Sequence, residues 1–352
     1  MQLFTPFRLR GTELKNRIVV SPMCEYSAKD GHATPWHLVH LGSRAVGGAA
    51  LVFTEATAVS AIGRISPQDT GIYLDSHVEA WAPIVKFLHE QGSLSGIQLA
   101  HAGRKASTDL PWQGGKPIPL HDGGWTPVGP SALPFDNGYT VPKALSLEQI
   151  EQVVADFVTA AQRALQAGFE VVEIHSAHGY LLHEFLSPFA NQRNDEYGGS
   201  FENRIRLVCR VAKSVREVWP EGRPVFVRIS ATDWKDGGWD LPQSIELARQ
   251  LKAVGVDLVD VSSGGAIPDA RIPFGPGYQV PFAEAIRREA GIATGTVGMI
   301  LEPAQADTII STGQADVVLL AREMLRDPYW PRRAAQALGA KLKPPVQYER
   351  AW

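Results

Sequence analysis

Short runs of β-branched and aliphatic residues recur along the chain, and each is followed by a segment with the spacing of an amphipathic helix. The runs predict eight strands, at residues 18–21, 50–54, 96–99, 171–175, 225–230, 258–262, 293–297 and 317–321. The helical spacing predicts helices at 35–46, 77–91, 147–167, 201–218, 241–253, 280–290, 303–311 and 328–337. The helix over 147–167 shows its period most clearly, with apolar side chains at Ile150, Val153, Val154, Phe157, Ala161, Ala164 and Leu165.

This alternation of strands and helices predicts an α/β fold. Eight largely apolar strands, each followed by a helix, are typical of a parallel sheet covered by helices, and eight such units close into a (β/α)8 TIM barrel. A doubly wound open sheet is the rival arrangement. It is less favoured because no Gly-x-Gly-x-x-Gly follows the first strand, which ends instead in Ser21, Pro22, Met23 and Cys24.

One segment interrupts the regular pattern. Residues 107–144 are rich in Gly, Pro and Asp and include Trp112 and Trp125. A loop of this length inside a compact domain is usually functional or holds small strands of its own, so we predict an excursion over the barrel mouth. No shift in composition divides the rest of the chain, and we expect a single domain over residues 1–352.

Composition narrows the class of protein further. The chain has 352 residues, 44% of them hydrophobic and 20% charged, with a formal charge of −3, and no cluster of Lys and Arg suggests nucleic acid as a partner. The apolar stretches are too short to cross a membrane, and the first residues lack an apolar signal core, so we expect a cytoplasmic protein. In such a compartment Cys24 and Cys209 are expected to be free thiols.

Polar and redox-capable side chains gather where the predicted strands end. In a barrel of this type the active site is built at the carboxyl ends of the strands. Those positions carry the segments 21–26, 54–57, 98–105 and 175–180, together with Arg228 and Gly298. Their concentration on one rim predicts a functional site there.

These segments resemble the Old Yellow Enzyme family of FMN-dependent ene-reductases, and more narrowly its thermophilic-like bacterial branch, which includes xenobiotic reductases. The resemblance runs from Leu3 to the last residue and includes the segments 195–200, 202–204 and 345–352. It implies bound FMN, NADPH or NADH as the reductant, and reduction of activated carbon–carbon double bonds.

His175 and His178 are the central pair of the predicted site. On a continuing strand a separation of three would point them to opposite faces, but both can face the mouth if the strand ends at His175. A metal site is an alternative, with His183 or the helically spaced His37 and His40 as further ligands. It is disfavoured because no Glu lies between His37 and His40 and no carboxylate stands at ligand spacing.

By resemblance, His175 and His178 instead donate hydrogen bonds to the carbonyl or nitro oxygen of a substrate. Two such donors would stabilise the negative charge that develops on this oxygen when hydride reaches the β-carbon. Tyr180 resembles the family's proton donor to the α-carbon; the alternative is a tyrosine that anchors the loop by packing.

The resemblance also assigns a flavin cradle. Gln98 would contact the pyrimidine edge of the ring, and Arg228 would lie beside N1 and O2, where its charge stabilises reduced flavin. Arg228 is also expected to need a buried partner, for which Glu173 on the inward face of the preceding strand is the candidate. Contacts around the ring are expected from Ser21, Pro22, Met23 and Ala56.

Phosphate binding is expected in the loops after the seventh and eighth strands, as in other barrels of this type. Gly298 and the pair Ala321 and Arg322 stand there, and backbone N–H groups with a guanidinium would suit the dianion. By resemblance a glycine is the expected residue just before Arg322, and Ala321 leaves slightly less room.

Three more residues complete the predicted mouth. By resemblance the Cys24 thiol lies near the C4–N5 edge of the flavin and tunes its potential, although a free cysteine is often just a small buried hydrophobe. Tyr26 and Lys105 are expected to shape the pocket for substrate and nicotinamide; for Lys105 a solvated surface charge is an equal alternative.

The C-terminal segment 348–352 resembles a tail that reaches into a neighbouring subunit, with Arg350 completing the partner's site. The alternative is a frayed terminus. The apolar Trp352 at the last position favours a covered tail, and we predict a homodimer or homotetramer.

Three other functions are weighed against this prediction. The histidine pairs alone would permit a metal-dependent hydrolase on the same barrel. A flavin enzyme with an iron–sulfur cluster is disfavoured because two distant cysteines cannot supply four thiolates. A barrel that only binds ligands is disfavoured by the full set of polar groups on the rim.

Overall fold

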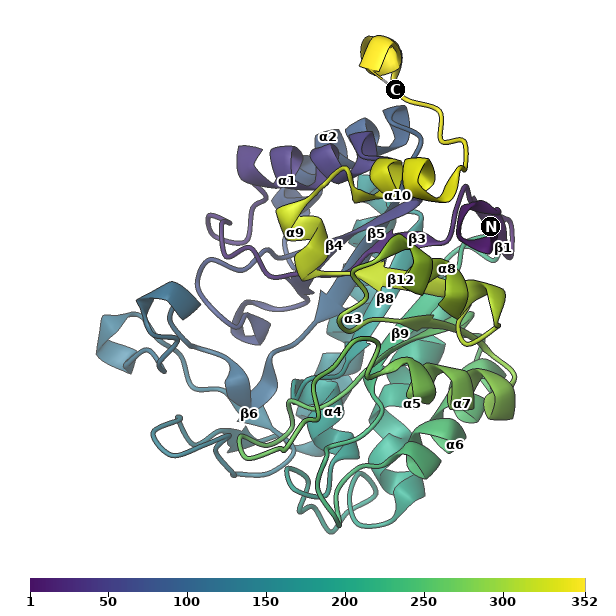
Figure 1. Ribbon diagram of the computed structural model, residues 1–352. Helices are drawn as coiled ribbons and strands as arrows, with labels where there is room; N and C mark the ends of the chain where they lie inside the picture. The colour runs from purple at the N-terminus through teal and green to yellow at the C-terminus, as the bar shows by residue number, and fades with distance from the viewer. Residues whose placement is uncertain (352) are drawn as a thin grey trace.

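The computed structural model describes residues 1–351, and its centre is a closed barrel of eight parallel strands. In spatial order the strands are β10 (Leu258–Ser262), β11 (Ala293–Thr296), β12 (Val317–Leu320), β3 (Ile18–Val20), β4 (Leu51–Ala58), β5 (Leu94–Ala100), β8 (Val171–Ser176) and β9 (Val225–Ser230). Figure 1 shows the helices packed around this barrel. The predicted (β/α)8 TIM barrel is confirmed.

Helices connect successive strands on the outside of the barrel (Figure 1). They are α1 (Pro35–Val46), α2 (Asp75–Glu90), α3 (Leu147–Ala167), α4 (Leu181–Leu186), α5 (Phe201–Val218), α6 (Leu241–Ala253), α7 (Val280–Ala290), α8 (Pro303–Ser311), α9 (Arg322–Arg326) and α10 (Trp330–Leu338). Three of these helices begin at N-cap residues: the side chains of Ser146, Ser200 and Asp240 accept hydrogen bonds from backbone N–H groups in the first turns of α3, α5 and α6.

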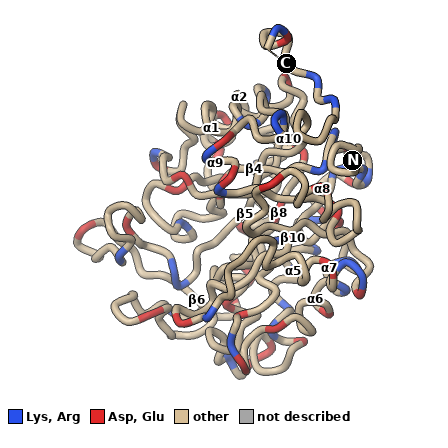
Figure 2. The backbone as a smooth tube through the Cα atoms, in the orientation of Figure 1, with Lys and Arg blue, Asp and Glu red and all other residues tan. Residues whose placement is uncertain are grey.

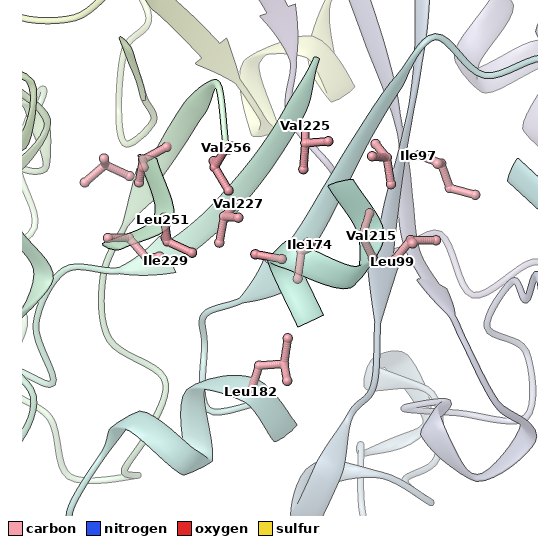
Figure 3. Close-up of a cluster of buried hydrophobic side chains, with 14 of the residues drawn as sticks. Ile97, Leu99, Ile174, Leu182, Val215, Val225, Val227, Ile229, Leu251 and Val256 are labelled. Atoms are coloured by element: carbon pink, nitrogen blue, oxygen red, sulfur yellow. The ribbon is translucent and has the colours of Figure 1, made fainter. Parts of the chain in front are cut away.

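The alternation of side chains along each strand separates two apolar cores. On β9, Val225, Val227 and Ile229 point outward and pack beneath the helices (Figure 3). Phe226 on the same strand points into the barrel and packs with residues of other strands, such as Phe53. The inward position two residues beyond Phe226 is Arg228, so the period of the strand carries a guanidinium into the upper barrel.

The ends of several elements differ from the sequence-based prediction. The helix expected at 328–337 is present as α10, which begins at Trp330, and the short helix α9 before it was not predicted. Pro328 lies in the break between α9 and α10, where its ring cannot continue a helix from the preceding turn. β4 continues to Ala58 through an irregularity in register between Phe53 and Ala56. An unpredicted antiparallel hairpin, β1 (Phe7–Leu9) with β2 (Thr12–Leu14), packs Leu14 against the inner core.

The segment 107–144 runs outside the regular succession of barrel strands and helices (Figure 1). It contains the short 3-10 helices Pro111–Gln113 and Leu120–Asp122 and two short strands, the first of which is β6 (Val128–Gly129). β6 pairs in parallel with β7 (Lys143–Ala144) at the end of the segment. The excursion therefore does hold small strands of its own.

Candidate active site

Polar side chains from four neighbouring strands meet inside the upper barrel. Gln98 on β5 donates from Nε2 to Oε1 of Glu173 on β8 at 2.8 Å. Arg228 on β9 lies in register with His175 on one side and Asp260 on the other. All these side chains are buried, which makes their mutual partners decisive for the stability of the site.

The expected pairing of Arg228 with Glu173 is corrected by the structure. Arg228 Nε lies 3.0 Å from Oδ2 of Asp260, an ion-pair distance without the alignment of a hydrogen bond, and its Nη2 donates to Ser21 Oγ at 3.1 Å. The register of β9 with β10 explains the difference, because Asp260 stands directly opposite Arg228. Burial, with the charge of Asp260, raises the pKa of Glu173, and Arg228 partly offsets this effect.

His175 and His178 lie together at the end of β8. Their ring centroids are 5.2 Å apart, and the Tyr180 ring lies 5.1 Å from His175. The strand ends at Ser176, and His178 has φ 60°, so the chain turns and both histidines share one side. His178 N–H donates to Ser230 Oγ at 2.9 Å, and its Nε2 lies 2.7 Å from Ser262 Oγ.

Both imidazoles are held in their neutral form. Burial, followed by the charge of Arg228, lowers the pKa of each well below its usual value. Each neutral ring carries one N–H donor. Within the described residues, His175 Nδ1 is buried and has no hydrogen-bond partner.

Lys105 lies against this turn and is not a solvated surface charge. Its Nζ donates to the carbonyl oxygens of His178 at 2.9 Å and of Gly265 at 3.2 Å. The same ammonium lies 5.1 Å from the Tyr180 ring centroid and 4.4 Å from that of Phe135, which belongs to the excursion. Burial lowers the pKa of Lys105 to about 8.

Cys24, Tyr26 and Tyr180 pack against one small apolar cluster, formed by Ile65, Ala102 and Ala106. Burial raises the pKa of the Cys24 thiol, and the nearby carboxylates of Asp69 and Glu55 add to the effect. Tyr26 has φ 47°, and its ring meets that of Trp112 from the excursion at 5.9 Å. The segment 107–144 thus reaches the predicted mouth.

A cavity of about 240 Å³ lies beside Arg228, between the loops after β11 and β12. Its lining includes all the predicted phosphate-binding residues: Gly298, Ala321 and Arg322. Arg326, one helical turn after Arg322, also lines it and was missed by sequence analysis, although the spacing of four on a helix was a usable signal.

The histidines considered as metal ligands each meet a carboxylate. His37 Nε2 is hydrogen-bonded to Glu55 Oε1 at 2.9 Å, and His40 Nε2 lies 3.3 Å from Glu25. His183 Nε2 lies 3.0 Å from Asp233. Sequence spacing did not reveal these carboxylates, but across residues 1–351 no three His, Cys, Asp or Glu side chains are arranged to hold a metal ion.

The predicted tail residue does not join the other site residues in this chain. Arg350 is exposed in the last 3-10 helix, Val346–Ala351, which projects beyond α10 (Figure 1). The prediction for Trp352 lies outside the described residues. Lys and Arg are interspersed with Asp and Glu over the described chain (Figure 2). No helix of residues 1–351 is long and apolar enough to cross a membrane.

Comparison with known proteins identifies the family. The sequence model of the NADH:flavin oxidoreductase / NADH oxidase family matches residues 2–341. A protein of Bacillus licheniformis named NADPH dehydrogenase is 50% identical over 353 residues, covering 100% of this chain and 99% of its own. Another of the same name from Bacillus subtilis is 48% identical, with the same coverage of both chains.

Solved structures agree with this match. Morphinone reductase in complex with tetrahydroNAD superimposes with a TM-score of 0.80 at 29% identity, covering 98% of this chain and 93% of the other. A 2-naphthoyl-CoA reductase gives a TM-score of 0.86 at 25% identity, covering 96% of this chain and 52% of the other.

Fold, site and comparisons together define a (β/α)8-barrel flavin oxidoreductase. The chain belongs to the NADH:flavin oxidoreductase / NADH oxidase family, known as the Old Yellow Enzyme family. Membership implies FMN as the bound cofactor and a reduced nicotinamide, NADPH by the name of the relatives, as the electron source.

Proposed function

We propose that this enzyme reduces activated carbon–carbon double bonds, in α,β-unsaturated carbonyl or nitro compounds, with His175 and His178 gripping the activating oxygen. One observation carries the proposal: two neutral imidazoles lie 5.2 Å apart at the barrel mouth, and one of them has a buried nitrogen, His175 Nδ1, without a partner among residues 1–351. An unpaired buried polar atom is costly, so it favours a ligand that supplies the missing partner.

The residues around this pair suit FMN. The cavity lined by Gly298, Arg322 and Arg326 offers cationic side chains to a phosphate. Arg228 and Gln98 stand in the lumen where they would meet the polar edge of the ring, with Pro22, Met23 and Ala56 as walls. When bound, FMN supplies hydride from its N5 atom to the β-carbon of the substrate.

The tautomer of His178 matters for this role. If Ser262 Oγ–H donates to His178 Nε2, the proton of the ring is on Nδ1, which is then free to donate to the substrate. Ser262 is available for this because Ser263 Oγ donates to Gln279 Oε1 at 2.6 Å, a shorter contact than the 3.4 Å from Ser262 to the same oxygen. Each donor aimed at developing negative charge supplies about 3–4 kcal/mol in comparable oxyanion holes.

We propose Tyr180 as the proton donor to the α-carbon, since its ring packs against His175 and its burial raises the pKa of the phenol, keeping it protonated. Tyr180→Phe should slow reoxidation of the reduced enzyme by cyclohexenone at least about 100-fold, the lower end of the range typical of general acids. Reduction by NADPH should be unchanged. Stopped-flow absorbance at the flavin band measures both steps, and equal reoxidation rates would assign the proton to solvent.

The remaining rim residues are assigned supporting roles. Cys24 and Tyr26 pack against the same cluster as Tyr180, and we propose that they border the flavin edge and the substrate. We propose that Lys105 holds the wall of the pocket through its hydrogen bond to the His178 carbonyl. Arg350 is proposed to complete the site of a neighbouring subunit in a dimer or tetramer, since in its own chain it lies on an exposed tail.

The decisive experiment uses the purified protein. It should be yellow, bleach anaerobically with NADPH and regain colour on addition of cyclohexenone. His175→Ala combined with His178→Ala should keep the flavin and its bleaching while losing at least about 100-fold in the reoxidation step, judged from the loss of one or two oxyanion donors. A colourless protein with stoichiometric zinc, or an unaffected double variant, would overturn the proposal.

A further inference from the structure

Glu55 is a buried carboxylate at the barrel mouth to which the proposed reaction gives no role. It stands in β4, within the irregularity in register between Phe53 and Ala56, and only 3% of its surface is exposed. A carboxylate is expensive to bury unless its oxygens are well supplied with donors.

Both oxygens of Glu55 have donors, and these come from two separate segments. Oε2 accepts the backbone N–H of Glu25 at 2.9 Å and, more weakly, that of Tyr26 at 3.4 Å. Oε1 is hydrogen-bonded to Nε2 of His37 at 2.9 Å. Glu55 therefore connects α1 to the chain segment that carries Cys24 and Tyr26.

The tautomer of His37 is fixed by its other nitrogen. His37 Nδ1 lies 2.9 Å from the backbone N–H of Thr34, a group that only donates. Nδ1 is therefore the acceptor, so the proton of the neutral ring is on Nε2 and points at Glu55. The ring itself is 1% exposed and packs edge-on against Trp81, which prevents it from turning away.

The segment that Glu55 holds has a backbone that needs holding. Tyr26 has φ 47°, the left-handed region that residues other than glycine adopt only when their surroundings impose it. Glu25 beside it is fixed to α1 as well, because Trp36 Nε1 donates to its Oε2 at 3.0 Å. Glu55 accepts from the main-chain N–H groups of both Glu25 and Tyr26, between the Cys24 thiol and the Tyr26 phenol, and so fixes this stretch to β4.

We propose that Glu55, oriented by His37, is the positioning residue of the segment 24–26, fixing Cys24 at the flavin edge and placing a negative charge beside it. The inference rests on the proposed function only in placing Cys24 next to FMN. It has two consequences: the charge disfavours the thiolate form of Cys24, and it lowers the reduction potential of the bound flavin, because added electrons are repelled. Burial is the largest cause of the raised pKa of Cys24, the charge of Asp69 is the next, and Glu55 adds to both.

The test compares variants that differ in a single hydrogen bond. In Glu55→Gln the amide NH2 must face either His37 Nε2–H or the N–H of Glu25, so that donor meets donor on one side. His37→Gln keeps a donor for Glu55, whereas His37→Leu removes it at similar volume. His89→Gln is the matched control, since His89 lies 2.9 Å from Glu170, before the start of β8 and thus at the opposite end of the barrel.

Two readouts separate positioning from general loss of stability: the midpoint potential of the bound FMN, and the rate of Cys24 alkylation by iodoacetamide, read by peptide mass so that Cys209 serves as internal reference. Glu55→Gln should raise the potential and speed alkylation roughly tenfold, the change expected from one pKa unit of the thiol. His37→Leu should act in the same direction, because a buried carboxylate that loses its donor takes up a proton and its negative charge is lost. His37→Gln should stay within about twofold of the wild type by the same measure, and His89→Gln should equal it.

Unchanged potential and alkylation in Glu55→Gln and His37→Leu, with flavin still bound, would overturn the inference. So would a His37→Gln variant as perturbed as His37→Leu, because the hydrogen bond would then not be the cause. If Glu55→Gln fails to fold, the two His37 variants decide alone. If the wild type bound no FMN the proposed function would fail, and the alkylation rates would still test the positioning.

Discussion

At the scale of single residues, the behaviour of the histidine pair depends on which nitrogen of His178 carries the proton. Ser262 Oγ lies 2.7 Å from His178 Nε2, and the neighbouring Ser263 Oγ donates to Gln279 Oε1. Burial lowers the pKa of His178, so the ring is neutral and has one proton to place. Ser262 is thus the group that can bias this proton toward the substrate.

Ser262→Ala should weaken binding of a phenol or of the product ketone, measured by titration of the flavin spectrum. The lost hydrogen bond corresponds to about 0.5–1.5 kcal/mol, or roughly two- to tenfold in Kd. Ser263→Ala should weaken binding less, since it leaves Ser262 in place and only frees Gln279 Oε1, 3.4 Å from Ser262 Oγ, to compete for the Ser262 proton. Equal Kd values for wild type and Ser262→Ala would show that the tautomer is set elsewhere.

A second prediction at this scale concerns Glu184, which is fully buried on α4. Burial raises its pKa from 4.5 to about 8, an effect that Arg104 and the backbone N–H of Arg104 only partly offset. Between these two pH values the folded protein binds a proton that the unfolded chain releases, so the free energy of unfolding falls as pH rises through the window. Glu184→Gln lacks this proton and should escape the fall.

The difference in free energy of unfolding between Glu184→Gln and the wild type should therefore shift in favour of Glu184→Gln by at least about 1 kcal/mol from about pH 5 to about pH 8, taking about 1.4 kcal/mol per pKa unit. Urea unfolding at several pH values measures it. Glu79→Gln, at an exposed position on α2, should show a difference that does not change with pH. A constant difference for Glu184→Gln would mean that its carboxyl is ionised in the folded state.

Residue types at strand ends were predictable from the sequence, and their partners were not. Gln98, His175 and Arg228 could be placed because the alternation of side chains along a strand fixes the face they are on, and the active site of such barrels lies at the carboxyl ends of the strands. Asp260 replaced Glu173 as the partner of Arg228 because the choice depends on the register of β9 with β10. Register depends on the whole closed barrel, and no local pattern in the sequence encodes it.

At the scale of elements, the turn after β8 is pressed against the loop after β10. Gly265 has φ 90°, and a Cβ placed on it would lie 2.6 Å from the Cα of His178. Gly237 has a similar φ of 81°, but a Cβ there would meet nothing within 4 Å. Both glycines thus have a left-handed backbone, but Gly265 also lies against His178 of the site and Gly237 does not.

Gly265→Ala should lower both the stability and the catalytic rate of the enzyme, whereas Gly237→Ala should lower the stability alone. The left-handed backbone costs about 1–2 kcal/mol with a side chain in either variant. The added clash in Gly265→Ala should displace His178, and a displacement of about 1 Å can cost on the order of 100-fold in rate. Unfolding curves and steady-state kinetics on both variants check this, and normal kinetics in Gly265→Ala would show that the turn adapts.

Long periodic elements were predicted well, and short ones were missed. All eight barrel strands and the helix α3, expected at 147–167, were found in place. β6 and β7 have two residues each and α4 has six, too few for a period of two or 3.6 to show. α4 follows directly on Tyr180, so the part of the chain that is hardest to predict adjoins the proposed site.

At the scale of the whole molecule, the barrel brings together residues from both halves of the chain, and Arg350 stays apart from them. The tail projects beyond α10 (Figure 1), and residues 346–351 are exposed. A guanidinium on such a tail can serve a site only if another copy of the chain is beside it, and a symmetric pair would exchange two tails. This arrangement predicts that two defective subunits can complement each other.

Arg350→Ala and His178→Ala should each give enzymes with little activity toward cyclohexenone, the first with a raised KM. Co-expressed with two different affinity tags and purified on both, they form a mixed dimer in which one site has an intact His178 and receives Arg350 from the other subunit. That dimer should recover about half of the wild-type activity, since one of its two sites is complete. Both parents should keep their flavin, which confirms that the barrel is intact. A mixed dimer as inactive as its parents, or a wild type that sediments as a monomer, would contradict sharing, because Arg350 would then serve its own chain or no site at all.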